Sequence, residues 1–267
     1  MECLVFSGMT DVVVVEKRGN VQWIRFNRPK QRNALNKEMY DIIVGALDDA
    51  DNDDDITYVV FTGTGEFYSS GNDFSPKSLP QMTKQGISEK FLYQVWVDRL
   101  IMHKKILIAL VNGPAIGIAC TTLSLFDLIV CSDKAYFLTP FTQMGICPEG
   151  TSSISFMRSM GYTKAAQMIL FSEPLTAQDA FTAGFVARVI PQESFQEETA
   201  KLVDKYSKNL VPQSVLFSKK MVRTDAIKNE LLGVNTLEGI CVEERMFAPE
   251  TLERITARFG PKPKPKL

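Results

Sequence analysis

The sequence has few of the residues that most often bind metals or form disulfide frameworks. Its 267 residues include 1 histidine and 5 cysteines, and no two cysteines form a CxxC pair. The cysteines are Cys3, Cys120, Cys131, Cys147 and Cys241. An odd number of irregularly spaced cysteines is typical of plain buried thiols in a reducing compartment. We therefore expect no structural zinc and no other metal site.

The chain also lacks a strong charge of either sign and any long apolar run. Its 30 basic and 31 acidic residues leave a formal net charge of −1, which gives no general attraction to nucleic acid or to an anionic membrane. An uninterrupted apolar stretch of about 18 residues, which a membrane-spanning helix needs, does not occur. The first ten residues, MECLVFSGMT, lack the basic and apolar regions of a secretion signal. We expect neither a nucleic-acid partner, nor a membrane span, nor secretion.

Several charged residues receive structural interpretations. The acidic stretch from Asp48 to Asp55 is interpreted as a solvated helix end and loop, because it lacks the glycine and the closing glutamate of a calcium-binding EF-hand loop. His103, at a predicted helix end beside two lysines, is expected to be a surface charge. Asp73 is expected to stabilise its own loop.

Strands alternate with helices through the first half of the chain. A hairpin turn at Gly19 separates two β-rich segments, and Asn36 is a good N-cap for a helix that ends near Ala50. The predicted strands are Val12–Val15, Val21–Phe26, Tyr58–Phe61, Ile106–Val111, Leu128–Cys131 and Ala135–Phe137, with a helix from about Glu89 to Met102. This order predicts an α/β fold around a buried, largely parallel sheet.

The second half is mostly helical. The predicted helices are Ser152–Met160, Thr163–Phe171, Thr176–Ala183, Glu193–Lys208 and Asp225–Phe247, with a strand at Phe185–Val189. We divide the chain into an N-terminal extension (residues 1–10), a core (11–200), a C-terminal helical region (201–258) and an extended basic tail (259–267).

Two glycine-containing turns follow buried strands. They are YSSGND at residues 68–73 and NGPAIGI at residues 112–118. Such turns bring unpaired backbone N–H groups to the end of a strand, and the second turn is also at the start of a helix. If the two turns face each other, they form an oxyanion hole.

The order and spacing of these turns and of three further motifs resemble the crotonase (enoyl-CoA hydratase/isomerase) superfamily. The motifs are Asn27-Arg28-Pro29, Asn33-Ala34-Leu35, Ser69 to Asp73, Asn112 to Gly117 and Pro148-Glu149-Gly150. The resemblance covers residues 11 to 258 and is greatest to the peroxisomal Δ3,Δ2-enoyl-CoA isomerases. It implies a crotonase-like ββα spiral core with a C-terminal helical trimerisation region, and a homotrimer or hexamer. It also implies an acyl-CoA thioester substrate and no separate cofactor, since coenzyme A is part of the substrate.

The family pattern assigns roles to particular residues of this chain. The N–H groups of Asn72 and Ile118 correspond to the two oxyanion donors. The residues that correspond to substrate or coenzyme A contacts are Lys30, Tyr68, Ser69, Ser70, Gly71, Asn72 and Gly117.

The acid–base residues point to isomerisation. In the resembling hydratases two glutamates orient one water, and this chain has Thr121 and Phe141 at those positions. Glu149 remains, and one carboxylate suffices to move a proton from C2 to C4. Burial near Phe137, Phe141 and Ile146 is expected to raise its pKa. Alternatives are dienoyl-CoA isomerisation, hydration, or a non-catalytic interaction module.

The chain ends in Pro265-Lys266-Leu267, which is close to the peroxisomal address Ser-Lys-Leu. We interpret it as a signal for the peroxisomal import receptor; the alternative is a disordered basic tail. The predicted localisation is peroxisomal, and otherwise mitochondrial or cytoplasmic.

Overall fold

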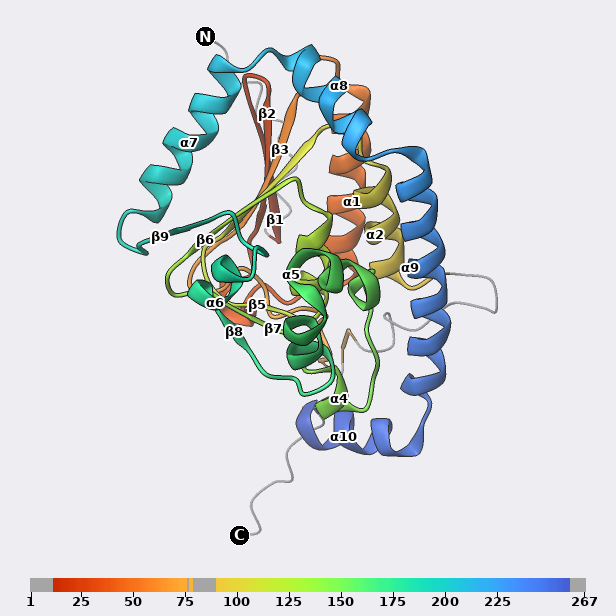
Figure 1. The fold of residues 1–267 in the computed structure, drawn as a ribbon. Helices are drawn as coiled ribbons and strands as arrows, with labels where there is room; N and C mark the ends of the chain where they lie inside the picture. The colour runs from red at the N-terminus through yellow and green to blue at the C-terminus, as the bar shows by residue number, and fades with distance from the viewer. Residues whose placement is uncertain (1–11, 76, 79–89, 260–267) are drawn as a thin grey trace.

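A computed structural model describes residues 12–75, 77–78 and 90–259 (Figure 1). Its main sheet has six strands in the order β1-β2-β3-β4-β6-β9. The strands are β1 (Val13–Arg18), β2 (Val21–Phe26), β3 (Tyr58–Gly63), β4 (Ile106–Val111), β6 (Leu128–Ser132) and β9 (Arg188–Ile190). The β1–β2 hairpin is antiparallel and every other pair is parallel, so β2, β3, β4 and β6 all end at one edge of the sheet. The predicted parallel sheet is confirmed.

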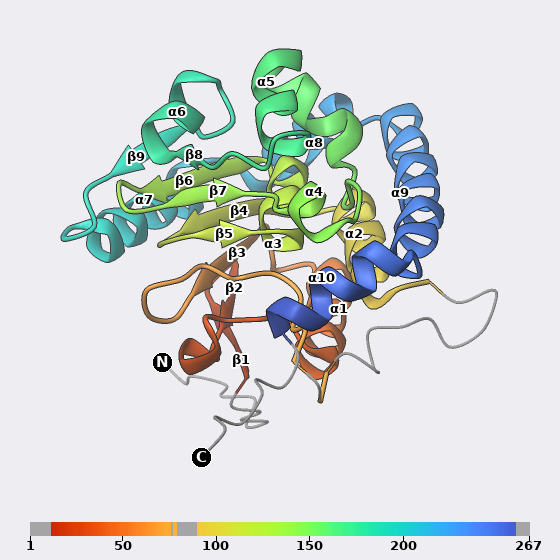
Figure 2. The same ribbon diagram turned by 90° about the horizontal axis from the view of Figure 1, so that it is seen from below.

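A smaller sheet lies beside that edge (Figure 2). It consists of β5 (Ala115–Ile116), β7 (Tyr136–Leu138) and β8 (Leu175–Thr176). The strand predicted near Ala135–Phe137 is β7, which pairs in parallel with β5. The small sheet therefore carries the NGPAIGI turn.

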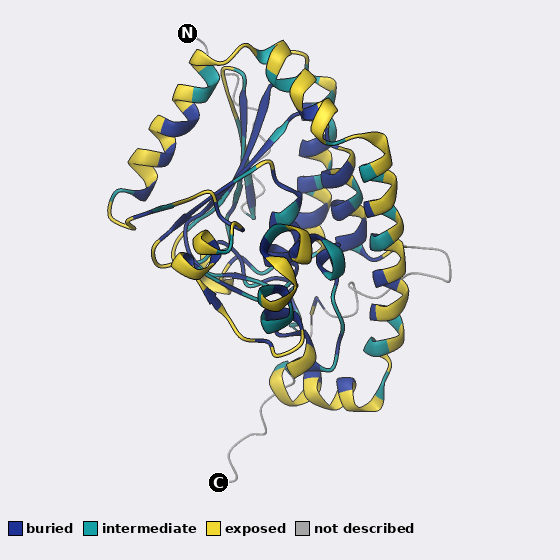
Figure 3. Ribbon diagram, in the orientation of Figure 1, coloured by how far each residue is buried: buried dark blue, intermediate teal, exposed yellow. Residues whose placement is uncertain are grey.

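The main sheet is buried on both faces, as Figure 3 shows. Alternate strand residues point to opposite faces. One set, which includes Val59 and Phe61, packs in the core that also contains buried residues of α1 (Lys37–Asn52) and α2 (Leu92–Met102). The other set, which includes Tyr58 and Val60, packs against α7 (Phe195–Asn209). Burial on both faces explains the nearly continuous apolar character of these strands.

Local sequence signals determine where several helices begin or are interrupted. The predicted Asn36 cap begins α1, where its side chain accepts a hydrogen bond from the N–H of Met39 at 3.0 Å. Helix α5 (Ser152–Ile169) is interrupted at Gly161, whose φ of 77° and ψ of 163° are not helical, so it consists of two helical segments, as predicted. The shorter helices are α3 (Ile118–Thr121), α4 (Phe141–Met144) and α6 (Ala177–Thr182), with 3₁₀ turns at Pro29–Gln31 and Thr122–Leu125.

The C-terminal helical region contains two helices that were not predicted. These are α8 (Pro212–Val222) and α10 (Pro249–Phe259), which flank α9 (Asp225–Met246). Both begin at a proline, which interrupts a helix interior but is well tolerated in a first turn. None of the helices in the described part of the chain is long and apolar enough to cross a bilayer.

The interpretation of His103 as a surface charge is wrong. Its side chain is 1% exposed, and its Nδ1 lies 3.0 Å from Oδ1 of Asp51 at the end of α1. Next to it, Nζ of Lys219 on α8 lies 2.8 Å from Oδ2 of Asp127. We call these four residues the paired cluster. His103 is buried where the end of α1 and α8 meet the segment after α2, and burial lowers its pKa.

The cysteine prediction holds for only part of the chain. Cys120 and Cys131 are buried free thiols, and Cys147 is partly buried. Cys241 is exposed on the outer side of α9, which corrects the expectation that it is buried. Cys3 lies outside the described residues.

Candidate active site

The two glycine turns lie against each other. Gly71 has a φ of +84°, and a Cβ placed on it would lie 2.6 Å from the carbonyl oxygen of Ile116 and 3.6 Å from Cα of Gly117. Only glycine allows both this left-handed backbone and this close approach. Ser69 also forms an isolated parallel bridge with Ala115, which fixes the register of the two segments.

The backbone N–H of Asn72 points away from the segment at Leu35, with which Asn72 forms a parallel bridge. Leu35 bonds to the residues on either side of Asn72: its N–H donates to the Gly71 carbonyl at 2.8 Å, and its carbonyl accepts from the Asp73 N–H at 2.9 Å. In a parallel bridge of this kind the N–H of Asn72 points to the opposite side. The Asn72 side chain is fixed as well, because its Oδ1 accepts a hydrogen bond from the Tyr40 hydroxyl at 2.6 Å.

Ile118 is the first residue of α3. The preceding Gly117 has φ 59° and ψ −131°, a conformation that favours glycine, and its carbonyl accepts from the N–H groups of Cys120 and Thr121. The first N–H groups of a helix have no intrahelical acceptor. The sequence therefore places an available N–H at Ile118, next to the turn that holds Asn72.

The loop before α5 brings Glu149 to the same place. Gly150 has a φ of +68°, and a Cβ on it would collide with Oγ1 of Thr121 and lie 3.1 Å from Cδ1 of Ile118. The Ser152 hydroxyl donates to the Glu149 carbonyl at 2.8 Å. The three motif segments, distant in sequence, thus meet at the start of α3.

Glu149 is a buried acid with a raised proton affinity. Glu149 is 4% exposed, and its carboxylate accepts no hydrogen bond from the residues that the structure describes. Burial, and secondarily the negative charge of Glu238, raise its pKa to about 8. The predicted direction is confirmed. A pKa in this range suits a general base that works near neutral pH.

Phe137, Phe141 and Ile146, which were expected near Glu149, are themselves buried: Phe137 packs edge-on to Phe185, and Phe141 and Ile146 pack with Ile255 of α10. The titratable groups on which the charge of Glu149 acts are Tyr40, Tyr93 and Cys147, whose pKa values are raised mainly by burial. The hydroxyl of Tyr93 is buried and has no hydrogen-bond partner among the described residues.

Glu238 of α9 was not predicted as part of this site. It is 5% exposed; its Oε2 accepts the N–H of Thr151 at 2.6 Å and its Oε1 accepts the N–H of Ser153 at 2.9 Å. One sequence signal could have indicated it. Asn235 and Glu238 lie in helical spacing with Leu231 and Val242, so two polar residues occupy the face of α9 where an apolar stripe would be expected.

The residues predicted to contact coenzyme A divide into two groups. Tyr68 and Ser69 are buried: the Tyr68 ring lies 5.3 Å from that of Phe26, and the Ser69 hydroxyl donates to the Asn33 carbonyl at 2.7 Å. Their side chains hold the turn, which leaves the backbone for contacts. Lys30 is exposed and lines a cavity of about 410 Å³ with Pro29, Arg32, Gly65, Glu66 and Phe67.

Arg32 and Phe67 were not predicted as parts of this cavity. The Arg32 guanidinium carbon lies 5.2 Å from the centre of the Phe67 ring. Nearby, Asp73 stabilises its loop as predicted, because its carboxylate accepts from Nη1 of Arg28 and from the N–H of Ser75, each at 3.0 Å.

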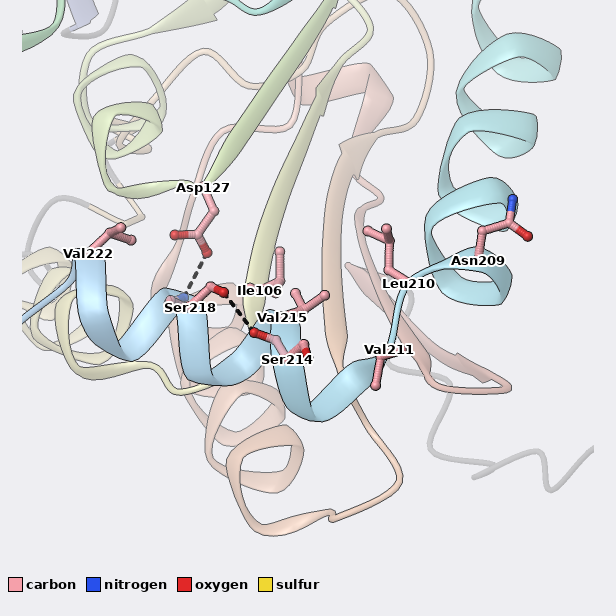
Figure 4. Close-up of a pocket in the computed structure, with 10 residues that line it drawn as sticks. Ile106, Asp127, Asn209, Leu210, Val211, Ser214, Val215, Ser218 and Val222 are labelled. Atoms are coloured by element: carbon pink, nitrogen blue, oxygen red, sulfur yellow. Dashed lines mark hydrogen bonds and ion pairs between the residues drawn. The ribbon is translucent and has the colours of Figure 1, made fainter.

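A larger cavity of about 580 Å³ lies at the opposite edge of the main sheet, beside α8 (Figure 4). Its polar groups are satisfied locally: Lys219 binds Asp127, and the Ser218 hydroxyl donates to the Ser214 carbonyl at 2.8 Å. None of the candidate site residues lines it. Within residues 12–75, 77–78 and 90–259, no group of three or more His, Cys, Asp or Glu residues is placed to bind a metal ion.

Known proteins are similar to this chain in sequence and in fold. Residues 16–248 match the family model described as Enoyl-CoA hydratase/isomerase. The Rattus norvegicus protein named Enoyl-CoA delta isomerase 2 is 38% identical over 94% of this chain, which spans 64% of that protein's length. The Mus musculus protein named Enoyl-CoA delta isomerase 3, peroxisomal, is 40% identical over 96% of this chain and 80% of its own length. The crystal structure of an enoyl-CoA hydratase/isomerase from Pseudoalteromonas atlantica T6c has a TM-score of 0.85 at 29% identity, covering 96% of this chain and 99% of that one.

Proposed function

Because the chain belongs to the enoyl-CoA hydratase/isomerase family, we propose that it converts 3-enoyl-CoA into 2-trans-enoyl-CoA as a step of fatty acid β-oxidation. The observation that carries this choice is the position of Glu149. It is a buried carboxylate with a raised pKa, beside the turn that holds Asn72, whose N–H points away from Leu35, and the start of α3, where Ile118 has an N–H without an intrahelical acceptor.

The proposed reaction is a 1,3-proton transfer. The Glu149 carboxylate takes a proton from C2, and the electrons of that C–H bond form a dienolate whose negative charge rests on the thioester oxygen. The N–H groups of Asn72 and Ile118 bind this oxygen, and each donor is worth roughly 3 kcal/mol of the barrier. The protonated Glu149 then donates at C4, which leaves the double bond between C2 and C3 and restores the carboxylate.

The coenzyme A part of the substrate is proposed to lie along the YSSGND turn. The backbone of Tyr68 to Gly71 is positioned by buried side chains, as a rigid binding edge requires. Lys30 and Arg32 place two cations at the adjacent cavity, where they suit phosphate groups. No separate cofactor is needed for the proposed chemistry.

The surroundings of Glu149 argue against hydration. A hydratase mechanism uses two carboxylates on one water, and the corresponding positions hold Thr121 and Phe141. Thr121 is occupied in packing against Gly150. The second acid that is present, Glu238, accepts a backbone N–H at each carboxylate oxygen, so it is bound to the first turn of α5.

The test is a panel of 3-enoyl-, 2-enoyl- and 3,5-dienoyl-CoA esters with the wild type and Glu149→Gln. We expect turnover of 3-enoyl-CoA by the wild type and a loss of at least about 1,000-fold in kcat for the variant, with coenzyme A ester binding retained. Glu193→Gln, an exposed acid away from the site, is the matched control. Near-normal turnover by Glu149→Gln would contradict the mechanism, and water addition to 2-enoyl-CoA as the main reaction would contradict the function.

We further propose import into peroxisomes through Pro265-Lys266-Leu267, which lies outside the described residues. The mouse relative, which is named as peroxisomal, supports this localisation. A fluorescent protein carrying the last ten residues should enter peroxisomes, and removal of Leu267 should prevent it.

We also propose a homotrimer or hexamer. Large apolar side chains are exposed on the C-terminal helices, among them Phe217, Met221, Leu237 and Ile240. Light scattering that gives the 29.9 kDa monomer mass would contradict this proposal.

A further inference from the structure

Two buried carboxylates from distant parts of the chain meet at the start of α5. Glu149 precedes this helix, and Glu238 reaches it from α9. The N-cap residue Thr151 has a φ of +68°, and its own side chain makes no capping hydrogen bond. Glu238 supplies the missing acceptors by binding the N–H groups of Thr151 and Ser153. The first turn of α5 is therefore capped by another helix.

Helix α9 is held against α2 in a fixed register. Asn235 and Gln94 exchange two side-chain-to-backbone hydrogen bonds, each at 3.0 Å, and Asn235 also donates to Oδ1 of Asp98 at 2.8 Å. A Cβ on Gly239 would collide with the side chain of Gln94, so the helices touch where Glu238 projects. Glu238 thus has a defined position relative to the Glu149 loop.

We propose that Glu238 is a positioning residue for the reaction: it holds the turn from Glu149 to Ser153 in place and keeps a fixed negative charge beside the Glu149 carboxylate. This inference rests on the proposed function of Glu149.

Glu238 is suited to be the fixed charge and Glu149 the group that exchanges protons. The N–H groups bound to Glu238 favour its ionised form and oppose the effect of burial, which raises its pKa. Glu149 has no such donors in the described part of the chain. A negative neighbour favours the protonated form of Glu149, which makes its carboxylate a stronger base.

The other titratable groups that face Glu149 are neutral at pH 7. They are Tyr40 from α1, Tyr93 from α2 and Cys147 from the preceding loop, and burial raises the pKa of each. Tyr93 and Cys147 also face Glu238. Glu238 is therefore the charged group that acts on Glu149 among these neighbours.

The test is the pH profile of kcat/KM in Glu238→Gln, with Glu244→Gln on the exposed side of α9 as the control. Glu149 must be ionised to take the C2 proton, so the wild-type profile should rise through the pKa of Glu149. In Glu238→Gln we expect this rise about one pH unit lower, with kcat at high pH reduced about tenfold because the turn is less well held. A rise at the wild-type pH with wild-type kcat overturns the proposal.

A second variant decides the case in which Glu238→Gln does not fold. Glu238→Asp keeps the charge but shortens the reach to the two N–H groups. We expect its profile to rise near the wild-type pH with kcat reduced about tenfold, and unchanged kcat would overturn the positioning role.

Failure of the proposed function is distinguishable from failure of this inference. If the wild type does not isomerise 3-enoyl-CoA, the carboxyl carbon of Glu149 can still be titrated by NMR in protein labelled with ¹³C-glutamate, with Glu149→Gln assigning the signal. A signal whose midpoint does not move in Glu238→Gln overturns the inference directly.

Discussion

Titratable side chains are buried at both edges of the main sheet, but only one edge pairs its acids with basic side chains. At the edge where the glycine turns meet, Glu149 and Glu238 have the same sign, and Glu149 is the one without hydrogen-bond donors among the described residues. At the other edge, the paired cluster joins Asp51 to His103 and Asp127 to Lys219. Burying an ion is costly unless it is paired and hydrogen-bonded, so removing one member of the paired cluster should destabilise the fold. The other edge leaves the acid Glu149 unpaired and raises its pKa, as its proposed role as a base requires.

The largest expected effect comes from inserting a methyl group between the two glycine turns. Gly71→Ala would place a methyl group against the Ile116 carbonyl and displace the Asn72 N–H, so we expect kcat/KM for 3-enoyl-CoA to fall by about 100- to 1,000-fold. Gly19→Ala is the matched control, because Gly19 also has a positive φ but has no atom within 4 Å of an added Cβ. Equal activities of the two variants would refute the oxyanion hole.

The next effect tests the paired edge. Lys219→Met leaves the buried carboxylate of Asp127 without its nearest cation, and we expect the free energy of unfolding to fall by about 3 kcal/mol. Since this cluster is separate from the glycine turns, kcat should not change. Denaturant unfolding and steady-state kinetics measure the two quantities, and the exposed neighbour change Lys220→Met controls for loss of charge alone. A fall in kcat with unchanged stability would show that the two edges are not separate in role.

An effect of opposite sign on stability is expected at the edge that holds Glu149. The folded-state pKa of Glu149, about 8, lies above its ordinary value of 4.5, so the folded protein holds a proton that the unfolded chain releases between these pH values. The stability of the wild type should therefore fall as pH rises from about 4.5 to 8. Glu149→Gln lacks this loss and should be more stable than the wild type by about 5 kcal/mol at pH 9, with little difference at pH 4.5. Equal stabilities at pH 9 would mean that the acid is not destabilised by its site.

The smallest effect concerns His103. Burial lowers its folded-state pKa below 6.5 despite the neighbouring Asp51 carboxylate, so the unfolded chain binds more protons as pH falls through 6.5. The wild type should lose stability between pH 7 and pH 5 through this residue. His103→Asn removes the titrating group, and thermal melts across this range should show a shallower pH dependence, by less than about 1 kcal/mol in all. An unchanged slope would show that His103 does not titrate in this range.

The sequence predicted those features whose signals are local. The hairpin at Gly19, the Asn36 cap and the buried strands each depend on a few neighbouring residues, and the structure contains all of them. The crotonase-like fold inferred from the order of the motifs is confirmed by its likeness to solved structures of the family. The meeting of the glycine turns was predictable because parallel strands end at a common edge.

The features that the sequence did not predict depend on distant contacts. Glu238 reaches a backbone N–H that is 87 residues away, and no local pattern records such a contact. The burial of His103 requires Asp51 and Lys219, which come from two other helices. Helices α8 and α10 begin with proline, whose effect on a helix depends on its position in it.

The cap that α9 provides for α5 has a consequence for synthesis. A ribosome makes Glu149 and the whole main sheet before it makes Glu238, so the α/β core can collapse while the first turn of α5 still lacks its acceptors. The acceptors for the first turn of α5 are therefore available only after α9 has been synthesised and has packed against α2.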